Sequence, residues 1–387
     1  MDKSQRSYFD VTLVFIIFLF MIISCISIYS AQKYSPYDVN FALRQVVWFF
    51  VAIGFSSFVY LFDFEQIKRI SPYIYGFGVL LLLVLFLAPE SIAPETKGAK
   101  AWFEIPGFGS LQPSEFMKVF LIIFLARVIV NHNEVHLNRT LQTDFLLLCK
   151  IGLTAAFPLG FILLQPDAGT AMAMTAIVIG MTFISGINWR IIATLGLIAA
   201  AVLGGLVYMY ITNPDWFLNF MDQYQLNRIH SWLEPFEDRG NTSYQLANSI
   251  LAIGSGTMYG KGFNLAQVNV PEAHSDFIFT IIGEEFGFFG ASIVISLYFM
   301  LIYRIIVIAL QNKGYYESLI ATGVISVLTF HIFENIGMVI GLVPITGIPL
   351  PLLSYGGSSL LGTMLSLALV LNISAKTRKY MFGENSD

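Results

Sequence analysis

The chain has 387 residues, of which 56% are hydrophobic and only 12% are charged, and its mean hydropathy is +0.71. This apolar share lies well above that of ordinary soluble domains and excludes a soluble globular protein. The formal net charge of −4 comes without a basic tail or patch, which excludes the usual kinds of nucleic-acid-binding protein.

Apolar stretches of about 17 to 25 residues, long enough to cross hydrocarbon as a helix, recur along the chain. In chain order they cover residues 11–31, 46–62, 72–87, 116–130, 146–164, 168–185, 191–211, 283–308, 319–343 and 358–372. The first is too long for the apolar region of a signal peptide and lacks a convincing cleavage site. We therefore expect an all-α polytopic membrane protein, with about ten transmembrane helices in a single domain over residues 1–387.

The basic residues indicate how the chain is oriented in the membrane. An even number of crossings puts both termini on one side, and cytoplasmic loops carry an excess of Lys and Arg. With cytoplasmic termini, thirteen of the 21 Lys and Arg residues fall in inner segments. We therefore expect both termini in the cytoplasm. Cys25 and Cys149 lie in separate apolar stretches, so neither a disulfide framework nor a cysteine metal site is expected.

Two predicted outer segments, residues 88–115 and 212–276, are too long to be simple connectors. They contain Trp102, Trp216 and Trp232 together with scattered charges, a composition that argues against disorder. The function is therefore expected on the outer face.

The segment PEAHSDFIFTIIGEEFG, residues 271–287, gathers three carboxylates beside an apolar stretch. Asp276 follows Ser275, a good N-cap, so a helix is expected to begin here at the membrane surface. Asp276 is then either a first-turn acid favoured by the helix dipole or a functional carboxylate. In a helical projection only Glu284, and not Glu285, could share its face. Charges at this depth are by default paired or functional.

Other charged residues mark the predicted outer boundary. Glu115 and Lys118 form an i, i+3 pair at the start of the fourth span, either as a local ion pair or as a substrate contact. Further outer cations either meet an anionic headgroup or are solvated, namely Lys97, Lys100, Arg228 and Lys261.

Three polar features are expected to be structural. His132 and His136 stand four residues apart in a cytoplasmic loop without an obvious third metal ligand. His331 and Glu334 lie three apart in a span, where a helix-packing hydrogen bond is expected. The glycine-rich LLSYGGSS, residues 352–359, indicates non-helical backbone that enters the last span.

Seven segments stand in a specific order along the chain: KGAKAWF (97–103), LQPSEFMK (111–118), QPDAGTA (165–171), NRIHSWLEP (227–235), AIGSGTMYGKG (252–262), PEAHSDFIFTIIGEEFG (271–287) and NIGMVIGLVPITGIPLPLLSYGGSS (335–359). Together they resemble the SEDS family, the polytopic shape, elongation, division and sporulation proteins of bacterial cell-wall synthesis. The resemblance covers nearly the whole chain. The form PITGIPLP resembles the rod-shape RodA branch more than the division FtsW branch.

The resemblance implies a peptidoglycan glycosyltransferase that polymerises lipid II into β-1,4 glycan strands on the outer face of the bacterial cytoplasmic membrane, for cell elongation. The implied partners are lipid II, the growing glycan linked to undecaprenyl pyrophosphate, and a class B penicillin-binding protein as transpeptidase. The essential carboxylate of the family maps to Asp276, its acid and base pair to Glu115 and Lys118, and the tryptophan of its first outer loop to Trp102. The family pattern GARRW is here GAKAW, residues 98–102, which leaves one cation where two are usual.

The expected mechanism gives each residue a role. Asp276 takes the proton of the acceptor hydroxyl, while Arg228, Lys100 and Lys118 stabilise the pyrophosphate leaving group and Glu115 orients Lys118. No cofactor is certain; a divalent cation, Mg²⁺ or Mn²⁺, is left open, and no ligand set in the sequence demands one. The alternatives are a lipid II flippase or transporter, a scaffold that activates a partner synthase, and a division or sporulation paralogue.

Overall fold

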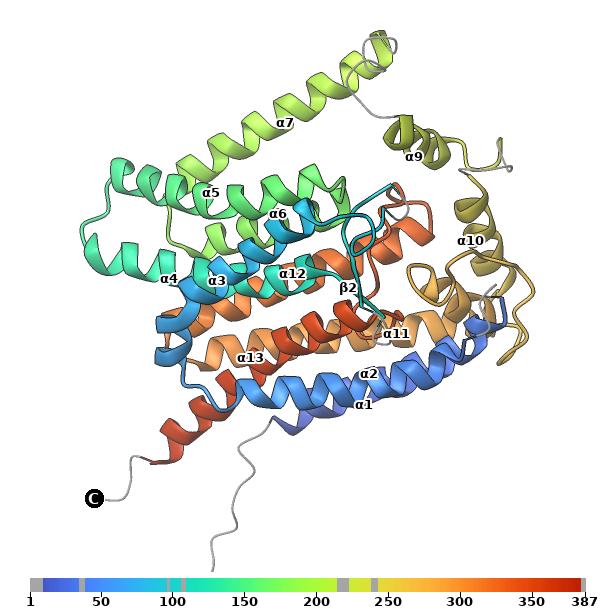
Figure 1. Cartoon of the computed structure of the whole chain (residues 1–387), viewed down its shortest axis with the longest axis horizontal. Coiled ribbons are helices and arrows are strands. Elements are labelled where there is room, and N and C mark those ends of the chain that lie inside the picture. The colour runs from blue at the N-terminus through green and yellow to red at the C-terminus, as the bar shows by residue number, and fades with distance from the viewer. Residues whose placement is uncertain are drawn as a thin grey trace, which may run out of the picture.

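The structure, a computed structural model, describes residues 10–34, 39–95, 98–105, 109–213, 223–237 and 243–383. This part of the chain is mainly helical (Figure 1). Its elements are α1 (Val11–Ala31), η1 (Gln32–Tyr34), α2 (Phe41–Val59), α3 (Phe64–Leu87), β1 (Phe103–Ile105), β2 (Gly109–Leu111), α4 (Pro113–Val135), α5 (Leu141–Leu164), α6 (Ala168–Ile184), α7 (Trp189–Thr212), α9 (Gln223–Leu233), α10 (Tyr244–Ser255), α11 (Ile278–Gln311), α12 (Tyr315–Val339) and α13 (Gly357–Gly383).

Polar residues define where many of the apolar helices begin. The side chains of Asp10, Asn40, Thr140, Asp167 and Asn188 accept hydrogen bonds from backbone N–H groups in the first turn of α1, α2, α5, α6 and α7. These bonds satisfy donors that have no partner within the helix, which matters most at a membrane boundary. Each predicted apolar stretch accordingly coincides with a helix.

The polytopic membrane fold is confirmed. In the described part of the chain, eight helices are long and apolar enough to cross a membrane, namely α1, α2, α3, α5, α7, α11, α12 and α13. Helix α6 is apolar but has only 17 residues, and α4 is not among the eight. The total of about ten crossings therefore stays a prediction.

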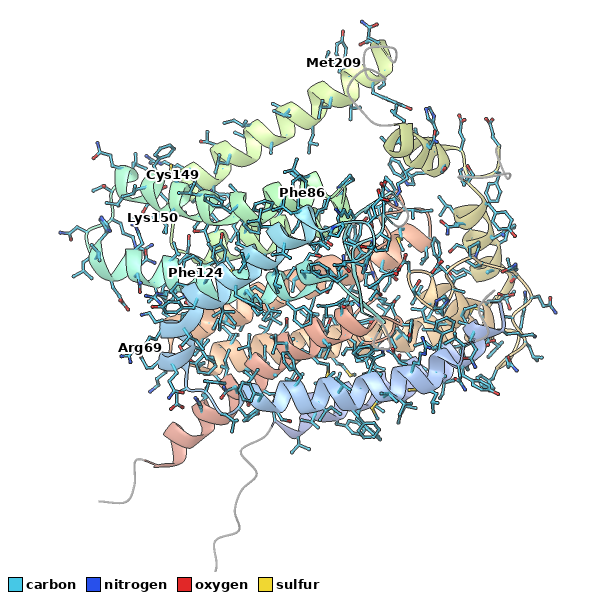
Figure 2. All side chains as sticks on the ribbon, in the orientation of Figure 1. Arg69, Phe86, Phe124, Cys149, Lys150 and Met209 are labelled. Carbon is cyan, nitrogen blue, oxygen red and sulfur yellow. The ribbon has the colours of Figure 1, made fainter. Side chains whose placement is uncertain are left out.

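The helices form a bundle whose centre is made by α4, α12 and α13 (Figure 1). Helices α1, α2 and α11 pack on one side of this centre, and α3, α5 and α6 pack on the other. Most of the residues in the apolar part of α13 are buried, whereas α7 has no buried residue and extends away from the body. Figure 2 shows side chains filling the space between the central helices, while those of α7 project from an isolated helix.

An ion pair joins helix ends that are distant in sequence. Arg304 of α11 donates to both carboxylate oxygens of Asp10, at 2.5 to 3.1 Å, and Ser374 of α13 donates to the same carboxylate at 3.4 Å. The start of α1 and the last turns of α13 therefore lie at one end of the bundle. Arg69 and Lys150, two of the thirteen basic residues in predicted inner segments, lie at the end away from α9 and α10 (Figures 1 and 2). This arrangement agrees with the expected topology, although the sidedness itself stays a prediction.

The two long connections carry more structure than expected. Between α3 and α4, strands β1 and β2 pair as an antiparallel hairpin, and α4 begins at Pro113 rather than at residue 116. Between α7 and α11 the chain forms α9 and α10. Proline at the first position of α4 explains its early start, because that position requires no backbone N–H.

Candidate active site

Asp276 lies in a turn before α11, not within a helix. Helix α11 begins at Ile278 with Phe277 as its N-cap, and no side chain caps it. Ser275 instead donates to the carbonyl and carboxylate oxygens of Glu272, at 3.3 and 3.2 Å. The expectation of a helix start capped by Ser275 was therefore wrong, and the helical projection of Asp276 onto the face of Glu284 does not apply.

Hydrogen bonds from two other segments hold the backbone of this turn. The side chain of Asn335, on α12, donates to the carbonyl oxygens of Asp276 and Ile348, both at 2.7 Å. Ser354, before α13, donates its hydroxyl to the carbonyl oxygen of Ser275 at 2.7 Å. Two of the motif segments, residues 271–287 and 335–359, thus meet at the Asp276 turn.

The Asp276 carboxylate lies beside the backbone of Gly347. Gly347 has a φ of +78°, in the left-handed region that favours glycine, and a Cβ atom there would lie 3.5 Å from Oδ2 of Asp276. Asp276 itself is half-buried. A half-buried carboxylate is accessible to a ligand yet partly withdrawn from water, which is the environment that a general base needs.

Glu284 has a different role from Asp276. It is fully buried, and its Oε1 accepts from Nζ of Lys261 at 2.5 Å and from the backbone N–H groups of Gln267 and Val268 at 2.8 and 3.1 Å. A buried charge is tolerated only when it is paired and hydrogen-bonded, as here. Lys261 is therefore not a solvated outer cation but the partner of Glu284.

Glu285 and its neighbours bind the same loop. Its side chain accepts from the hydroxyl of Ser30 and from the N–H of Ala266, the latter at 3.4 Å. Its carbonyl oxygen accepts from the N–H of Gly262 at 2.9 Å, and a Cβ atom on Gly260 would lie 2.1 Å from that oxygen. The GEEFG segment and the glycine-rich loop therefore form one closely packed structural unit.

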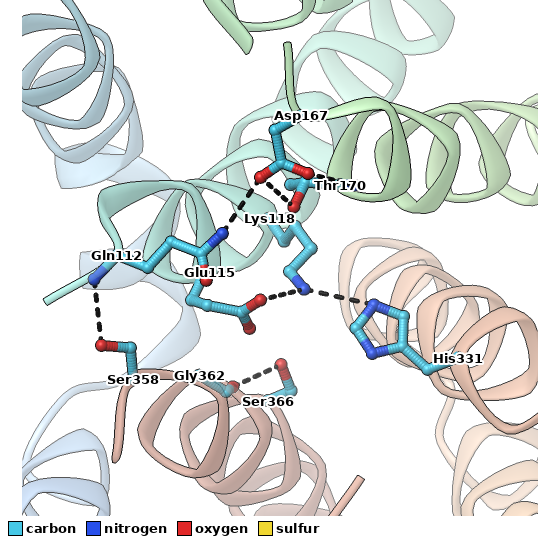
Figure 3. A network of polar contacts seen from close by, with 9 residues as sticks. All are labelled: Gln112, Glu115, Lys118, Asp167, Thr170, His331, Ser358, Gly362 and Ser366. Carbon is cyan, nitrogen blue, oxygen red and sulfur yellow. Dashed lines mark hydrogen bonds and ion pairs between the residues drawn. The ribbon is translucent and has the colours of Figure 1, made fainter. Parts of the chain in front are cut away.

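Glu115 and Lys118 form a buried ion pair in the first turns of α4 (Figure 3). Their charged atoms lie 2.9 Å apart, and the two residues are 4% and 5% exposed. Nζ of Lys118 also lies 3.2 Å from Nε2 of His331, on α12. On the other side, a Cβ atom on Gly362 of α13 would lie 3.4 Å from Oε2 of Glu115. The pair thus sits inside the bundle where α4, α12 and α13 meet.

A second polar network surrounds the start of α4 (Figure 3). The side chain of Gln112 donates to Asp167 at 3.0 Å, and its backbone N–H donates to the hydroxyl of Ser358 at 3.0 Å. Asp167 in turn accepts from the N–H and hydroxyl of Thr170, at 3.0 and 2.8 Å. These bonds connect α4 to the starts of α6 and α13 and fix the position from which Glu115 and Lys118 project.

The other predicted substrate-binding residues lie on the long connections. Lys100 donates to the carbonyl oxygens of Phe86 and Ala88 at the end of α3, where the helix dipole favours a cation. Trp102 is half-buried just before β1. Arg228 is half-buried on α9, and this helix is anchored where Trp232 donates to the carbonyl of Gly341 at 2.9 Å. Lys97 falls outside the described residues.

No metal centre is formed by the side chains that the structure describes. Within that part of the chain, no group of three or more His, Cys, Asp or Glu residues could hold an ion. The rings of His132 and His136 stack at 4.3 Å, and Nζ of Lys150 lies 3.2 Å from Nδ1 of His132. Cys25 and Cys149 are free thiols.

Sequence reasoning missed two residues that organise the site. His331 makes a hydrogen bond between packed helices, as expected, but its partner Lys118 was not predicted, and Asn335 holds the Asp276 turn. The available signal was the presence of both polar side chains, four residues apart, in an apolar span. Their spacing identifies a shared helix face, but it does not identify what that face touches.

Comparisons with known proteins agree with this architecture. The sequence model of the FtsW, RodA and SpoVE family, described as "Cell cycle protein", matches residues 5–379. Stage V sporulation protein E of Bacillus subtilis (strain 168) is 34% identical over 378 residues, which are 95% of this chain and 98% of that protein. A probable peptidoglycan glycosyltransferase FtsW of Lactococcus lactis subsp. lactis (strain IL1403) is 36% identical over 325 residues, 80% of this chain and 77% of that protein.

Two solved structures share the fold. One, described as "Structural coordination of polymerization and crosslinking by a peptidoglycan synthase complex", contains a chain that is 25% identical, with a TM-score of 0.76 and coverage of 95% of this chain and 98% of that chain. The crystal structure of the rod-shape-determining protein RodA of Thermus thermophilus is 26% identical, with a TM-score of 0.68 and coverage of 98% of both chains. The family match over residues 5–379 and the relative that is 34% identical over nearly the full length place this chain in the SEDS family of FtsW, RodA and SpoVE proteins.

Proposed function

We propose that this protein is a peptidoglycan glycosyltransferase that polymerises lipid II into β-1,4 glycan strands on the outer face of the cytoplasmic membrane. Relatives that are at least 30% identical carry the name peptidoglycan glycosyltransferase. The observation that carries the proposal for this chain is the Asp276 turn: α12 and the segment before α13 hold its backbone, and its carboxylate is half-buried.

Asp276 is proposed as the general base. The acceptor hydroxyl of the incoming lipid II loses its proton to this carboxylate as its oxygen attacks the anomeric carbon of the growing glycan. The bond from that carbon to the pyrophosphate breaks, and the configuration inverts from α to β. A positioned general base contributes about 10² to 10⁴ in rate, so the leaving group must be stabilised as well.

Cations are proposed to stabilise the pyrophosphate. Arg228 and Lys100 lie on the two long connections, and Lys118 lies deeper, with its charge balanced by Glu115. Trp102, near Lys100 in sequence, offers an aromatic face for the sugar. Because Lys118 is 5% exposed, it contributes by its field at close range or by contact with a group that enters the bundle.

A divalent cation, Mg²⁺ or Mn²⁺, is proposed only as a ligand of the pyrophosphate itself. The described side chains near Asp276 supply no complete ligand set, so no step is routed through the ion. To test this, the polymerisation rate is measured after EDTA treatment and again after Mg²⁺ or Mn²⁺ is added back. Recovery of the rate with either ion supports a metal bound through the substrate.

The proposed partner is a class B penicillin-binding protein that cross-links the new strand. One chain of similar fold comes from a peptidoglycan synthase complex that coordinates polymerization and crosslinking. We propose a role in cell elongation from the PITGIPLP segment, whereas relatives include division and sporulation proteins. Depletion followed by microscopy separates the roles: rounding indicates elongation, and filamentation indicates division.

A lipid II flippase is the second candidate. The buried network of Glu115, Lys118 and His331 favours it, since transporters place polar groups inside the bundle near the membrane midplane. A flippase transfers no proton from an acceptor hydroxyl, so that mechanism assigns no role to the Asp276 carboxylate.

The deciding assay is polymerisation of labelled lipid II by the purified protein in detergent, alone and with its transpeptidase. Wild type is expected to form glycan and Asp276→Asn to form none above background. Normal output from a folded Asp276→Asn protein removes Asp276 from the role of base. No output from wild type with any partner, together with headgroup translocation in proteoliposomes, favours the flippase.

A further inference from the structure

His331 stands out among the buried polar residues because the mechanism above does not use it. It is 4% exposed on α12, and its Nε2 lies 3.2 Å from Nζ of Lys118. The same ammonium lies 2.9 Å from Glu115 (Figure 3). Lys118 is thus held between an acid on its own helix and an imidazole on another.

The chemistry of the two nitrogens determines how this contact works. An ammonium donates hydrogen bonds and accepts none, so Nε2 of His331 must be unprotonated and act as the acceptor. The imidazole is then neutral, with its proton on Nδ1. Lys118 and Glu115 carry opposite charges, so the cluster of Lys118, Glu115 and His331 is neutral overall, as the low dielectric of a membrane interior requires.

Helix α12 joins this cluster to the Asp276 turn. His331 and Asn335 lie four residues apart, and therefore on one face of α12, with an axial separation of about 6 Å. Asn335 holds the carbonyl of Asp276 at 2.7 Å, while His331 contacts the ammonium of Lys118. One helix face thus sets the position of the proposed base and of a proposed cation relative to each other.

We propose that His331 is a positioning residue that orients the Lys118 ammonium by accepting a hydrogen bond from it. The inference rests on the proposed function for its kinetic consequence, but not for the contact itself. Without this acceptor, Glu115 is the one partner of the ammonium that remains among the described side chains, and the ammonium can rotate away from the position at which it stabilises the leaving group.

The kinetic test compares His331→Leu with His331→Gln in the lipid II polymerisation assay. Leucine removes the acceptor, and we expect kcat to fall by about tenfold to a hundredfold with KM nearly unchanged, the size of effect that misplacement of a reacting group produces. Glutamine retains an acceptor oxygen and is expected to keep kcat within about threefold of wild type. Equal losses in the two variants would overturn the positioning role.

Ser326→Ala is the matched control. Ser326 lies on the same helix and donates its hydroxyl to Thr322 within α12, at 2.8 Å. Its replacement alters α12 without touching Lys118, so kcat should remain at the wild-type value. A loss as large as that of His331→Leu would show that any change in α12 lowers activity, and it would overturn the specific role of His331.

A thermal test does not depend on activity and so separates this inference from the proposed function. The unfolding temperature is measured for wild type, His331→Leu, Lys118→Met and the double variant. We expect His331→Leu to lower it by more than about 2 °C when Lys118 is present and to have a clearly smaller effect in the Lys118→Met background, because the two side chains act as one unit. Equal shifts in the two backgrounds would overturn the contact, whether or not the wild type polymerises lipid II.

If Lys118→Met does not fold, the comparison of His331→Gln with His331→Leu by the same measurement takes its place. Glutamine should retain the wild-type unfolding temperature and leucine should not. An equal drop for both variants would again contradict the proposal.

Discussion

The Asp276 turn and the GEEFG segment come from one stretch of sequence, yet their carboxylates differ in burial and in hydrogen bonding. Glu284 and Glu285 are buried and hydrogen-bonded to a loop that they hold against α11. Asp276 is half-buried, in a turn whose backbone is held by other segments. Nearby carboxylates in the same motif therefore lie in different environments: Glu284 and Glu285 attach a loop, whereas the proposed base Asp276 remains partly accessible.

Asp276→Asn should give the largest change in activity and the clearest contrast. The rate of lipid II polymerisation is expected to fall by a factor of about 10² to 10⁴, because an amide cannot take the proton of the lipid II hydroxyl. The unfolding temperature should fall less than in Glu284→Ala, since Asn335 and Ser354 donate to the backbone carbonyls of Asp276 and Ser275, which the substitution keeps. A large drop in unfolding temperature would instead make Asp276 a structural residue like Glu284.

Glu284→Ala should show the opposite pattern. It leaves the Lys261 ammonium without its partner, and breaking a buried ion pair costs about 3 to 5 kcal/mol. Thermal unfolding in detergent is expected to show a large loss of stability. Glu284→Gln, which keeps an acceptor oxygen for the N–H groups of Gln267 and Val268, should lose less. Equally small losses of stability in Glu284→Ala and Glu284→Gln would contradict the structural role that distinguishes Glu284 from Asp276.

Gly260→Ala tests the close packing of the loop against α11. Gly260 has a φ of +78°, and an added Cβ atom would lie 2.1 Å from the carbonyl oxygen of Glu285. We expect a loss of about 1 to 3 kcal/mol in the free energy of unfolding. Gly254→Ala is the control, because no atom lies within 4 Å of its added Cβ. It should be neutral or slightly stabilising, and a comparable loss there would contradict the packing explanation.

Lys100→Gln is expected to have the smallest effect. Its ammonium lies against the last carbonyl groups of α3, so its loss weakens a helix end by about 0.3 to 1 kcal/mol. If Lys100 also contacts the pyrophosphate, KM for lipid II rises and the rise diminishes at high salt. An unchanged KM at all salt concentrations would leave Lys100 with the helix-end role alone.

The fold was largely predictable from local properties. The ten apolar stretches each coincide with a helix, because a chain in hydrocarbon must satisfy its own backbone hydrogen bonds, whereas α9 and α10 in the second long connection were not predicted. The boundaries were less accurate. Proline moved the start of α4 earlier, and the contacts of Ser275 with Glu272 left the start of α11 at Ile278.

The candidate site was only partly predictable. Spacing along one helix correctly paired Glu115 with Lys118, since residues three apart face each other. It could not pair Lys261 with Glu284, or His331 with Lys118, because these partners are 23 and 213 residues apart. The contacts of Asn335 and Gly347 with Asp276 could not be predicted for the same reason, because these residues are also distant in sequence.

The sequence by itself determined that this is a polytopic helical protein with a rare set of charges, because hydropathy and short-range spacing are local properties. Only the tertiary structure decided which charges are neutralised in the interior and which remain half-exposed. Burial and hydrogen bonding, not residue type, set the behaviour of a carboxylate, and both arise from helices that meet only when the bundle has formed.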